Sequence, residues 1–393
     1  MKTAIVGGGA AGFFAAINLK EMMPEADVVI LERSQHVLSK VAVSGGGRCN
    51  CTNTFYDVRD LSAVYPRGHR LLKRLFKVFG PEDAFRWFER HGVPLVVQDD
   101  QCVFPAAQDS HAIIDCFLGE CRRHHVEIRT GVAVDSLEQL DGYDHVVVTT
   151  GGQPRAEKLS WLEGHEVVKP VPSLFTLSVA DKDFVKLMGT VVEKATVAIP
   201  ATKFRAEGPL LITHWGMSGP AVLKLSSYAA RHLYDCSYCT PLSVNWTGCK
   251  EDEVRQEIAD IVVRNPHRQL SNVRPFGLPS RLWNYLLEKT LGVRSQVTWN
   301  NLGQREQNRL VNTLCNDNYQ TSGRAAFKDE FVTCGGIALS DVNPSTLESR
   351  VRPRLYFAGE VLDVDGITGG FNFQAAWTTA YVVAQSISRM EKK

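Results

Sequence analysis

A glycine-rich turn near the start of the chain limits its fold more than any other feature. An apolar run over residues 3–6 leads into Gly-x-Gly-x-x-Gly at Gly7, Gly9 and Gly12, and a helical pattern follows over residues 10–22. Gly7 permits a tight turn, Gly9 lets backbone N–H groups approach a pyrophosphate, and Gly12 lets helix and strand pack closely. The positive end of the helix then faces the phosphates. This spacing predicts a βαβ unit that binds a dinucleotide.

An acidic residue completes the motif. A second apolar run, residues 28–31, ends in Glu32, twenty residues after Gly12. A carboxylate at this position can accept hydrogen bonds from the adenosine ribose. Arg33 follows it, and this side chain either lies across the adenine or is a solvated arginine at the strand end. The residues expected to line the pyrophosphate are Gly7, Gly9, Ala11 and Gly12.

Composition sets broad limits on the chain. With 393 residues it exceeds what one core usually supports, so two or three domains are expected. The net charge of +1 gives no indication of a nucleic-acid partner or an acidic surface. No apolar run is long enough to span a bilayer, and the first strand begins where a signal peptide would lie. We therefore expect a cytoplasmic protein without a membrane or nucleic-acid partner.

Strand and helix patterns alternate over the first 150 residues, which predicts a parallel, doubly wound sheet. The expected strands are residues 3–6, 28–31, 94–97, 127–130, 132–137 and 144–149. The expected helices are residues 10–22, 71–91 and 111–124, with a long loop over residues 34–55.

The pattern changes near residues 170–172. Residues 174–238 are rich in β-branched residues, glycine and proline, which predicts an antiparallel β domain. Residues 355–358 return to a buried strand pattern, and an amphipathic helix follows at the C-terminus. Between these segments, apolar residues recur at helical spacing and predict core packing. They are Val254, Ile258, Ile261 and Val262, then Leu282, Trp283, Leu286 and Leu287, then Leu310, Val311 and Leu314.

Two longer runs are distinctive. Residues 40–50 read Lys-Val-Ala-Val-Ser-Gly-Gly-Gly-Arg-Cys-Asn, and residues 356–374 run from Tyr-Phe-Ala-Gly-Glu to Gly-Gly-Phe-Asn-Phe-Gln. Together they resemble the BaiN/YhiN-type flavoproteins, also called the aminoacetone oxidase family of FAD-binding enzymes. Residues 213–220, 278–282 and 332–336 match the same family, so the resemblance covers essentially the whole chain. Cys51, Phe371 and the short segment 153–165 depart from the family pattern.

The resemblance implies an α/β fold. A discontinuous Rossmann-like FAD-binding domain would be interrupted by an antiparallel β domain that carries a small helical bundle. The expected FAD-binding domain comprises residues 1–173 and 331–393, the β domain residues 174–248 and 317–330, and the helical insert residues 249–316. FAD, rather than NAD, is then the bound dinucleotide.

Several further residues are expected to bind FAD. Lys40 and Arg48 bracket the three-glycine loop, where Arg48 contacts the flavin side or forms a structural salt bridge. Asn50, Thr52 and Asn53 bind the ribityl chain or ring edge, or cap the backbone of their own loop. At the carboxyl ends of strands, where ligands of open α/β sheets bind, the expected residues are Thr150, Gly151, Gly152, Gly359 and Glu360. Val134 presents backbone groups to the adenine or is an ordinary core valine.

The start of the last helix is expected to face the pyrimidine end of the isoalloxazine. Its N–H groups and dipole would stabilise negative charge near N1 and O2 by about 0.3–2 kcal/mol. The residues assigned to this part of the FAD site are Asp365, Gly370, Phe371, Asn372 and Gln374.

The chain is therefore expected to be an FAD-dependent oxidoreductase that passes a hydride between a small organic substrate and flavin N5. O2 or NAD(P)H would complete the cycle, since no second dinucleotide motif is present. His214 is the candidate acid–base or substrate-contacting residue, with a structural histidine as the alternative. Family relatives are linked to amine oxidation and to reduction of steroid-type enones.

Two other functions remain open at this point. Cys49 and Cys51, or Cys236 and Cys239, could form a dithiol relay to the flavin, although a Cys-x-Cys disulfide ring would be strained. A non-catalytic FAD- or RNA-binding module is the other alternative, against which the near-zero net charge argues. No metal site is expected, because the Cys-x-x-Cys pair has neither a second such pair nor a histidine cluster beside it.

Overall fold

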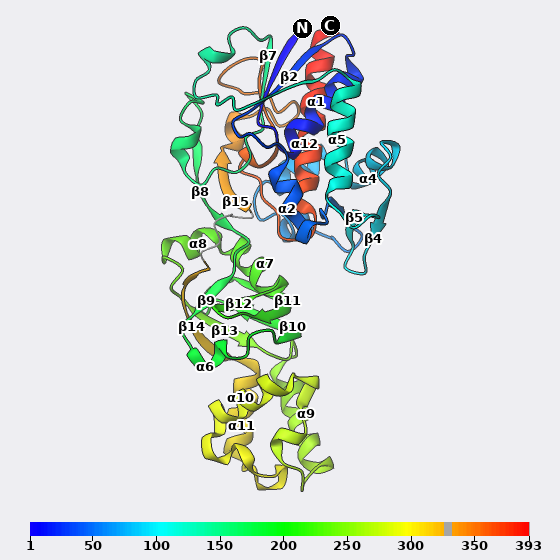
Figure 1. Ribbon diagram of the computed structural model, residues 1–393. Helices are drawn as coiled ribbons and strands as arrows, with labels where there is room; N and C mark the ends of the chain where they lie inside the picture. Colours follow the sequence, from blue (N-terminus) through cyan, green and yellow to red (C-terminus); the bar gives the residue numbers. More distant parts are fainter. Residues whose placement is uncertain (326–331, 393) are drawn as a thin grey trace. The chain divides into compact units, whose positions relative to one another are not determined.

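The computed structural model describes residues 1–325 and 332–392 (Figure 1). The chain divides into two compact units, Met1–Pro172 with Val332–Lys393, and Ser173–Phe331. The expected division of the second unit, into a β domain over 174–248 and 317–330 and a helical insert over 249–316, stays a prediction. The expected limits of the FAD-binding domain, 1–173 and 331–393, also stay a prediction. Residues 326–331 and 393, which fall within the expected domains, lie outside the described residues.

A parallel sheet forms the centre of the first unit. Its strand order is β16-β7-β1-β2-β6, and its register places Ile5 opposite both Ile30 and Val147. Because β1 lies in the middle and is covered on both faces, its residues from Thr3 to Val6 are buried without alternation. The strands are β1 (Lys2–Val6), β2 (Asp27–Glu32), β6 (Glu127–Thr130), β7 (His145–Val148) and β16 (Leu355–Phe357). The closing segment of the chain thus supplies an edge strand of the N-terminal sheet.

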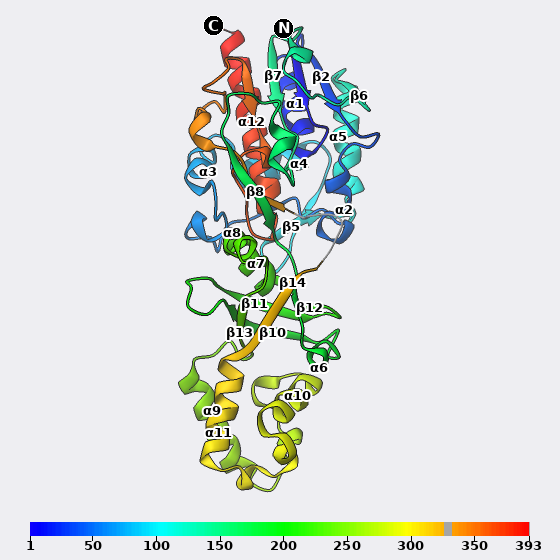
Figure 2. The ribbon, with the colours of Figure 1, turned by 90° about the vertical axis from the view of Figure 1, so that its left-hand side faces the viewer.

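Three helices pack side by side along this sheet (Figures 1 and 2). They are α1 (Ala10–Met22), α5 (His111–Arg123) and α12 (Phe371–Glu391). Phe14 of α1 lies 5.2 Å from Trp377 of α12 between ring centroids, and Phe117 of α5 lies 5.6 Å from Trp377. Since α1 is surrounded by these helices and the sheet, its middle turns are buried on every side.

Smaller elements complete the first unit. An antiparallel sheet has the order β3-β5-β4, and β15 pairs with β8. The strands are β3 (Thr52–Asn53), β4 (Leu95–Val97), β5 (Cys102–Pro105), β8 (Val167–Ser173) and β15 (Val332–Ile337). The helices are α2 (Ser39–Gly47), α3 (His69–Leu75) and α4 (Pro81–Arg90). Short 3-10 turns lie at Leu61–Ala63, Glu138–Leu140, Ala156–Leu159, Leu339–Asp341 and Gly359–Val361.

Three expectations for the first unit were wrong. Residues 132–137 form no strand, because the turn at Gly131 (φ +70°) ends β6 and the apolar alternation that follows finds no partner strand. The expected helix over 71–91 is two helices, since Pro81 begins a new one at its first position. The expected loop 34–55 contains α2, kinked at Ser44, and the short strand β3.

The second unit contains the expected antiparallel sheet, closed into a barrel with the order β10-β11-β12-β9-β14-β13. Its strands are β9 (Leu177–Val179), β10 (Val191–Ala198), β11 (Arg205–Ile212), β12 (Gly216–Ser218), β13 (Pro241–Asn245) and β14 (Asp317–Arg324). The expectation of β structure up to residue 238 was too broad, because α7 (Pro220–Tyr228) and α8 (Ala230–Asp235) occupy its last part. Pro220 stands at the first position of α7, where its missing N–H costs nothing.

The helical insert shares its core with the barrel. Its helices are α9 (Glu251–Arg264), α10 (Ser280–Leu291) and α11 (Gln304–Cys315), and α6 (Lys182–Val185) joins β9 to β10. The expected apolar stripes of α9, α10 and α11 point inward, and only Val262 among them is partly exposed. One continuous cluster includes Phe184 and Trp246 of the barrel together with Leu286 of α10. Trp246 donates to Asp317 at 3.0 Å, which satisfies the indole N–H inside this core.

No helix in the described parts of the chain has both the length and the hydropathy that a membrane crossing requires. The cytoplasmic location expected from the sequence stays a prediction.

Trp377→Ala tests the packing of α12 on α1. The indole is fully buried among aromatic rings and donates to the Cys51 carbonyl at 2.7 Å. We expect the free energy of unfolding to fall by about 3–5 kcal/mol, measured by urea unfolding followed by circular dichroism. Tyr56→Ala is the control, because Tyr56 is 83% exposed and its loss should cost less than about 0.5 kcal/mol. Equal losses for the two variants would contradict this role.

Candidate functional site

The candidate site lies where the carboxyl ends of β1, β7 and β16 meet. Gly7 follows β1, and its N–H donates to Leu31 O at 2.8 Å. The Thr149 hydroxyl, at the end of β7, donates to Gly7 O at 2.9 Å. Gly359 follows β16, and its N–H donates to Thr379 of α12 at 2.9 Å. The loops after β1 and β7 are therefore tied to each other, and the loop after β16 is tied to α12, at the edge where ligands of such sheets bind.

The glycines of the first turn differ in what a side chain at each position would contact. A Cβ on Gly7 (φ +116°) would lie 2.4 Å from Thr149 O, and one on Gly12 would lie 2.1 Å from Gly7 O. The fold itself requires these two. Gly9 has φ −95°, and a Cβ there would meet nothing within 4 Å. Glycine at position 9 thus keeps space open in front of α1.

The N-terminus of α1 is open to an anion. Its N-cap residue is Gly9, which has no side chain that could cap it, and its first turn carries no acidic residue. Its first N–H groups, including that of Ala11, have no partner inside the helix, as at any helix start. The open space at Gly9 and this uncapped helix fit a pyrophosphate.

Glu32 is held in place by backbone groups. Its two carboxylate oxygens accept from Gly8 N at 2.7 Å and from Ser34 N at 2.8 Å. Each oxygen keeps a second lone pair for a hydroxyl donor. Val132 N donates to Glu32 O, so the segment that leads to half-buried Val134 runs beside this residue. Arg33 is exposed next to it.

Glu360 joins several expected residues. Its Oε2 lies 2.9 Å from Lys40 Nζ, and its Oε1 accepts from Thr333 N at 2.8 Å. A Cβ on Gly152 would lie 2.6 Å from Glu360 Oε1, so this glycine allows the carboxylate to lie against the backbone after β7. Nearby, Gly151 has φ +71°, and the buried Thr150 hydroxyl has no hydrogen-bond partner in the described protein. An unpaired buried hydroxyl at this edge fits a polar ligand.

The start of α12 is tied to the loop that carries β3. Gly370 (φ +86°) lies so close to this loop that a Cβ would be 2.2 Å from Thr52 O. The Thr52 hydroxyl donates to Gln374 at 2.6 Å, and Asn53 donates to Gly369 O at 3.1 Å. In the orientation that satisfies its neighbours, the Asn50 amide donates to Thr52 O at 2.9 Å and accepts from Gly370 N at 3.2 Å. These three polar side chains thus order the loop.

Asn372 and Phe371 fix the next residues of α12. Asn372 accepts from Gly366 N at 2.8 Å and donates to Gly366 O at 2.9 Å. The Phe371 carbonyl accepts from Tyr65 at 2.8 Å, and its ring packs on Phe55. No side chain caps α12, whose first turn carries no acid. It is therefore a second helix N-terminus open to negative charge.

Two expected cofactor ligands have protein partners. Asp365 is fully buried and forms a bidentate ion pair with Arg67, a partner that no sequence pattern indicated. Arg48 lies 4.3 Å from the centre of the Phe104 ring and donates to Gly45 O at 3.2 Å. Both contacts order the loops around the site, and direct binding of FAD by Asp365 or Arg48 stays a prediction.

His214 belongs to the second unit. It is exposed at the turn between β11 and β12, with its ring centroid 3.7 Å from that of Trp215. Its expected role in chemistry stays a prediction.

The cysteines are all free thiols. Burial raises the pKa of Cys49 to about 12, and burial also raises that of Cys51 well above its usual range. The Cys51 thiol donates to Val103 O at 3.4 Å. Cys236 is half-buried and Cys239 exposed. Neither pair is joined, and buried thiols with raised pKa values are poor nucleophiles.

Comparison with known proteins identifies the family. The family described as HI0933-like protein Rossmann domain matches residues 1–386. The chain belongs to it. This confirms the resemblance to the BaiN/YhiN-type flavoproteins and the α/β Rossmann fold class. The chain is accordingly an FAD-dependent oxidoreductase.

Relatives match along the whole chain. A "3-dehydro-bile acid delta(4,6)-reductase" of Clostridium scindens is 27% identical and covers 97% of this chain and 98% of that protein. A "ribosomal RNA dihydrouridine synthase" of Escherichia coli is 28% identical and covers 98% of this chain and 97% of that protein. Among solved structures, a 3-ketosteroid delta1-dehydrogenase of Sterolibacterium denitrificans has a TM-score of 0.52 at 10% identity, with 99% of each chain covered. This last likeness concerns the fold.

Gly9→Ala separates cofactor binding from folding. Alanine fits position 9 of the protein itself, but its methyl group fills the space in front of α1. We expect the variant to bind FAD at least about 10-fold more weakly, measured by flavin fluorescence quenching, while the melting temperature of the apoprotein falls by only the few °C that alanine costs at an N-cap. Gly119→Ala in α5 is the control, since a Cβ there also meets nothing within 4 Å. Normal FAD affinity in Gly9→Ala would place the pyrophosphate elsewhere.

Thiol counting tests the dithiol relay. With a pKa near 12, Cys49 is only about 10⁻⁴ thiolate at pH 8. We expect ten thiols in guanidinium-denatured protein, whether the flavin was oxidised or photoreduced before denaturation. In native protein at pH 8, exposed Cys239 should react first, and Cys239→Ser should remove this phase. Two fewer thiols in the flavin-oxidised sample would establish a relay.

Proposed function

We propose that this chain reduces a carbon–carbon double bond conjugated to a carbonyl group. The proposal rests on one observation: the reactions named for two relatives that match along their whole length share this chemistry. The bile-acid reductase by its name acts on unsaturated bonds of a 3-oxo steroid, and dihydrouridine formation saturates a uracil double bond next to a carbonyl. Bound FAD would supply the hydride after two-electron reduction by a donor, for which we propose NAD(P)H.

The residues of the first unit have distinct parts in this proposal. The α1 N-terminus at Gly9 holds the pyrophosphate, and Glu32 holds the adenosine ribose. Glu360, fixed by Lys40 and Thr333 N, accepts from ribityl hydroxyls. The uncapped N-terminus of α12 stabilises negative charge by about 0.3–2 kcal/mol. Such stabilisation would favour the reduced, anionic form of the cofactor and so the half-reaction in which NAD(P)H reduces it.

The substrate also needs a proton. When a hydride adds to the β-carbon, negative charge develops on the carbonyl oxygen, and a proton must then reach the α-carbon. We propose His214 as the proton donor, because an imidazole is a common general acid and this side chain is exposed.

The substrate proposed first is a small enone. A uracil in RNA is the second candidate, and one surface feature favours it. Arg70, Lys73, Arg74 and Lys77 are exposed along one side of α3 and the turn after it, and none forms an ion pair with a described carboxylate. Such a stripe suits a phosphate backbone, and a net charge of +1 does not reveal it. The expectation of no nucleic-acid partner therefore stays unconfirmed.

The proposed reaction can be tested under anaerobic conditions. Protein reduced with NADPH or NADH is mixed with 2-cyclohexenone or, as control, cyclohexanone. We expect only the enone to restore the yellow colour and to gain two hydrogens, detected by mass spectrometry. A uridine-rich RNA in a parallel sample tests the second candidate. Oxidised protein is mixed with amines in a further sample. If amines alone react, by bleaching the oxidised flavin, the reaction class is amine oxidation instead.

In the same assay, His214→Gln should lower kcat about 100-fold or more while FAD affinity is unchanged. Unchanged kcat would leave His214 a structural residue.

A further inference from the structure

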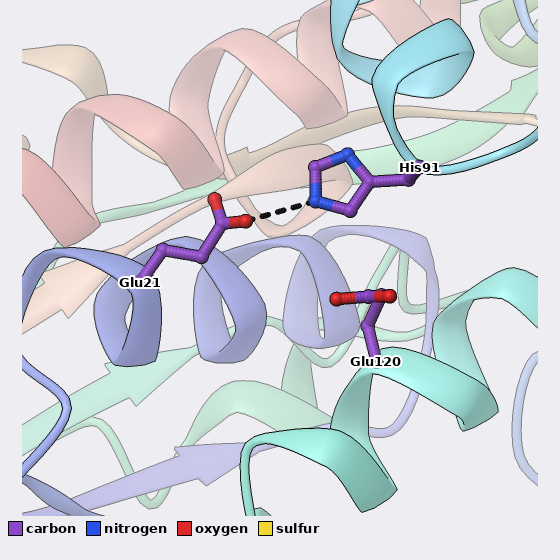
Figure 3. Close-up of side chains that lie close together, drawn as sticks. All are labelled: Glu21, His91 and Glu120. Carbon is purple, nitrogen blue, oxygen red and sulfur yellow. Dashed lines mark hydrogen bonds and ion pairs between the residues drawn. The ribbon is translucent and has the colours of Figure 1, made fainter.

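A second group of titratable side chains lies away from the candidate FAD site. Glu21 of α1, His91 after α4 and Glu120 of α5 come together, with their ligand atoms within 4.8 Å of one another (Figure 3). Glu21 follows Gly9 by twelve residues, which is about 18 Å along α1. The proposed flavin chemistry uses none of these groups.

His91 has an arrangement that requires a positive charge beside it. Its Nδ1 lies 2.7 Å from Trp87 O, and because a carbonyl only accepts, Nδ1 must carry hydrogen. Its Nε2 lies 2.8 Å from Glu21 Oε1. A neutral imidazole has one N–H, so a lone pair of Nε2 would then face a carboxylate oxygen. Either a proton or a metal ion must lie between these atoms.

The Nδ1 contact is typical of metal-binding histidines. An outer hydrogen bond to a backbone carbonyl fixes the tautomer and presents Nε2 to the ion. Trp87 also stacks on the imidazole, with ring centroids 3.8 Å apart, and so holds its plane.

A fourth group lies beside the cluster. His124 follows Glu120 by one helical turn, and its Nε2 lies 3.4 Å from Glu120 Oε2. This nitrogen is buried and has no hydrogen-bond partner in the described protein. The two carboxylates of Glu21 and Glu120 thus lie together beside two imidazoles, a set of donor atoms that a divalent cation would bridge.

We propose that Glu21, His91 and Glu120, with His124 beside them, bind a divalent transition-metal ion of which Zn²⁺ is the test case. Imidazole nitrogens and carboxylate oxygens are suitable zinc ligands, at about 2.0–2.2 Å. Tetrahedral ligands are then roughly 3.4 Å apart, the distance already found between His124 and Glu120.

The remaining adjustments are small. Glu21 must move away from His91 by about 0.6 Å, and Glu120 must approach by at most about 1.4 Å. The Glu21 side chain is 35% exposed, so it is free to shift. The ion would join the end of α1 to α5 and to the turn after α4. Its role is structural, because it lies far from the N-terminus of α1.

Zinc binding is measured on the FAD-loaded protein after treatment with EDTA, dialysis and addition of zinc sulfate. Bound zinc is counted by mass spectrometry after removal of free ion. Glu21→Gln with Glu120→Gln keeps the size of the side chains but removes both charges and leaves one acceptor oxygen on each. Glu25→Gln with Glu89→Gln is the matched control, since both glutamates are exposed, Glu25 just after α1 and Glu89 in the last turn of α4. Both double variants keep every cysteine, so a difference in zinc content between them cannot come from zinc bound by cysteines.

We expect the Glu21/Glu120 pair to bind one zinc fewer per chain than the natural protein and the control. Zinc should raise the melting temperature of the natural protein and of the Glu25/Glu89 control by about 5 °C, and EDTA should reverse this rise. The Glu21/Glu120 pair should show no such rise, while its FAD content stays normal.

Equal zinc content and equal thermal response in all three proteins would overturn the proposal. His91 is then protonated and forms an ion pair with Glu21. Because FAD content and enone reduction are measured on the same samples, this outcome does not depend on whether the proposed function is correct.

Discussion

The packing of α12 on α1 holds the first unit together, because these two helices come from opposite ends of the chain. Phe14 and Trp377 meet between them, and Trp377 also donates to the carbonyl of Cys51, which lies in the loop beside the site. The same arrangement brings β16 next to β7 and ties Gly359 to Thr379. The turn after β1 and the start of α12 are thus parts of one site only when both ends of the chain have folded together.

The sequence predicted those elements whose signal is local. The strand, turn and helix at residues 3–22 and the acid at 32 follow from a short motif, and the stripes of α9, α10 and α11 follow from periodicity. Predictions failed where tertiary partners decide. Residues 132–137 have strand-like alternation but no neighbour to pair with, and residues 220–235 contain turn-forming residues that in fact start a helix at Pro220. Alternation and proline each fit more than one structure until the surroundings are known.

The polar contacts of the site were less predictable than its glycines. Lys40 and Glu360 are 320 residues apart, and Arg67 and Asp365 are 298 residues apart, so no sequence window contains either pair. Asp365 was expected among the cofactor ligands, and its burial against Arg67 gives it a second, structural reason to be an acid. The cluster at His91 has the same character, since its members come from three separate elements.

Both helix N-termini at the site are uncapped and lack acidic residues in the first turn, although side-chain caps are the usual way to satisfy such N–H groups. A cap on α1 would occupy the place of the pyrophosphate, and a cap on α12 would compete for the donors expected to face the flavin. Because the N-cap residues are the glycines Gly9 and Gly370, each helix gives up only about a few tenths of a kcal/mol of local stability relative to a side-chain cap. The buried aromatic contacts between α1 and α12 offset this loss, so the packing of the two helices is what allows their open ends to serve an anionic cofactor.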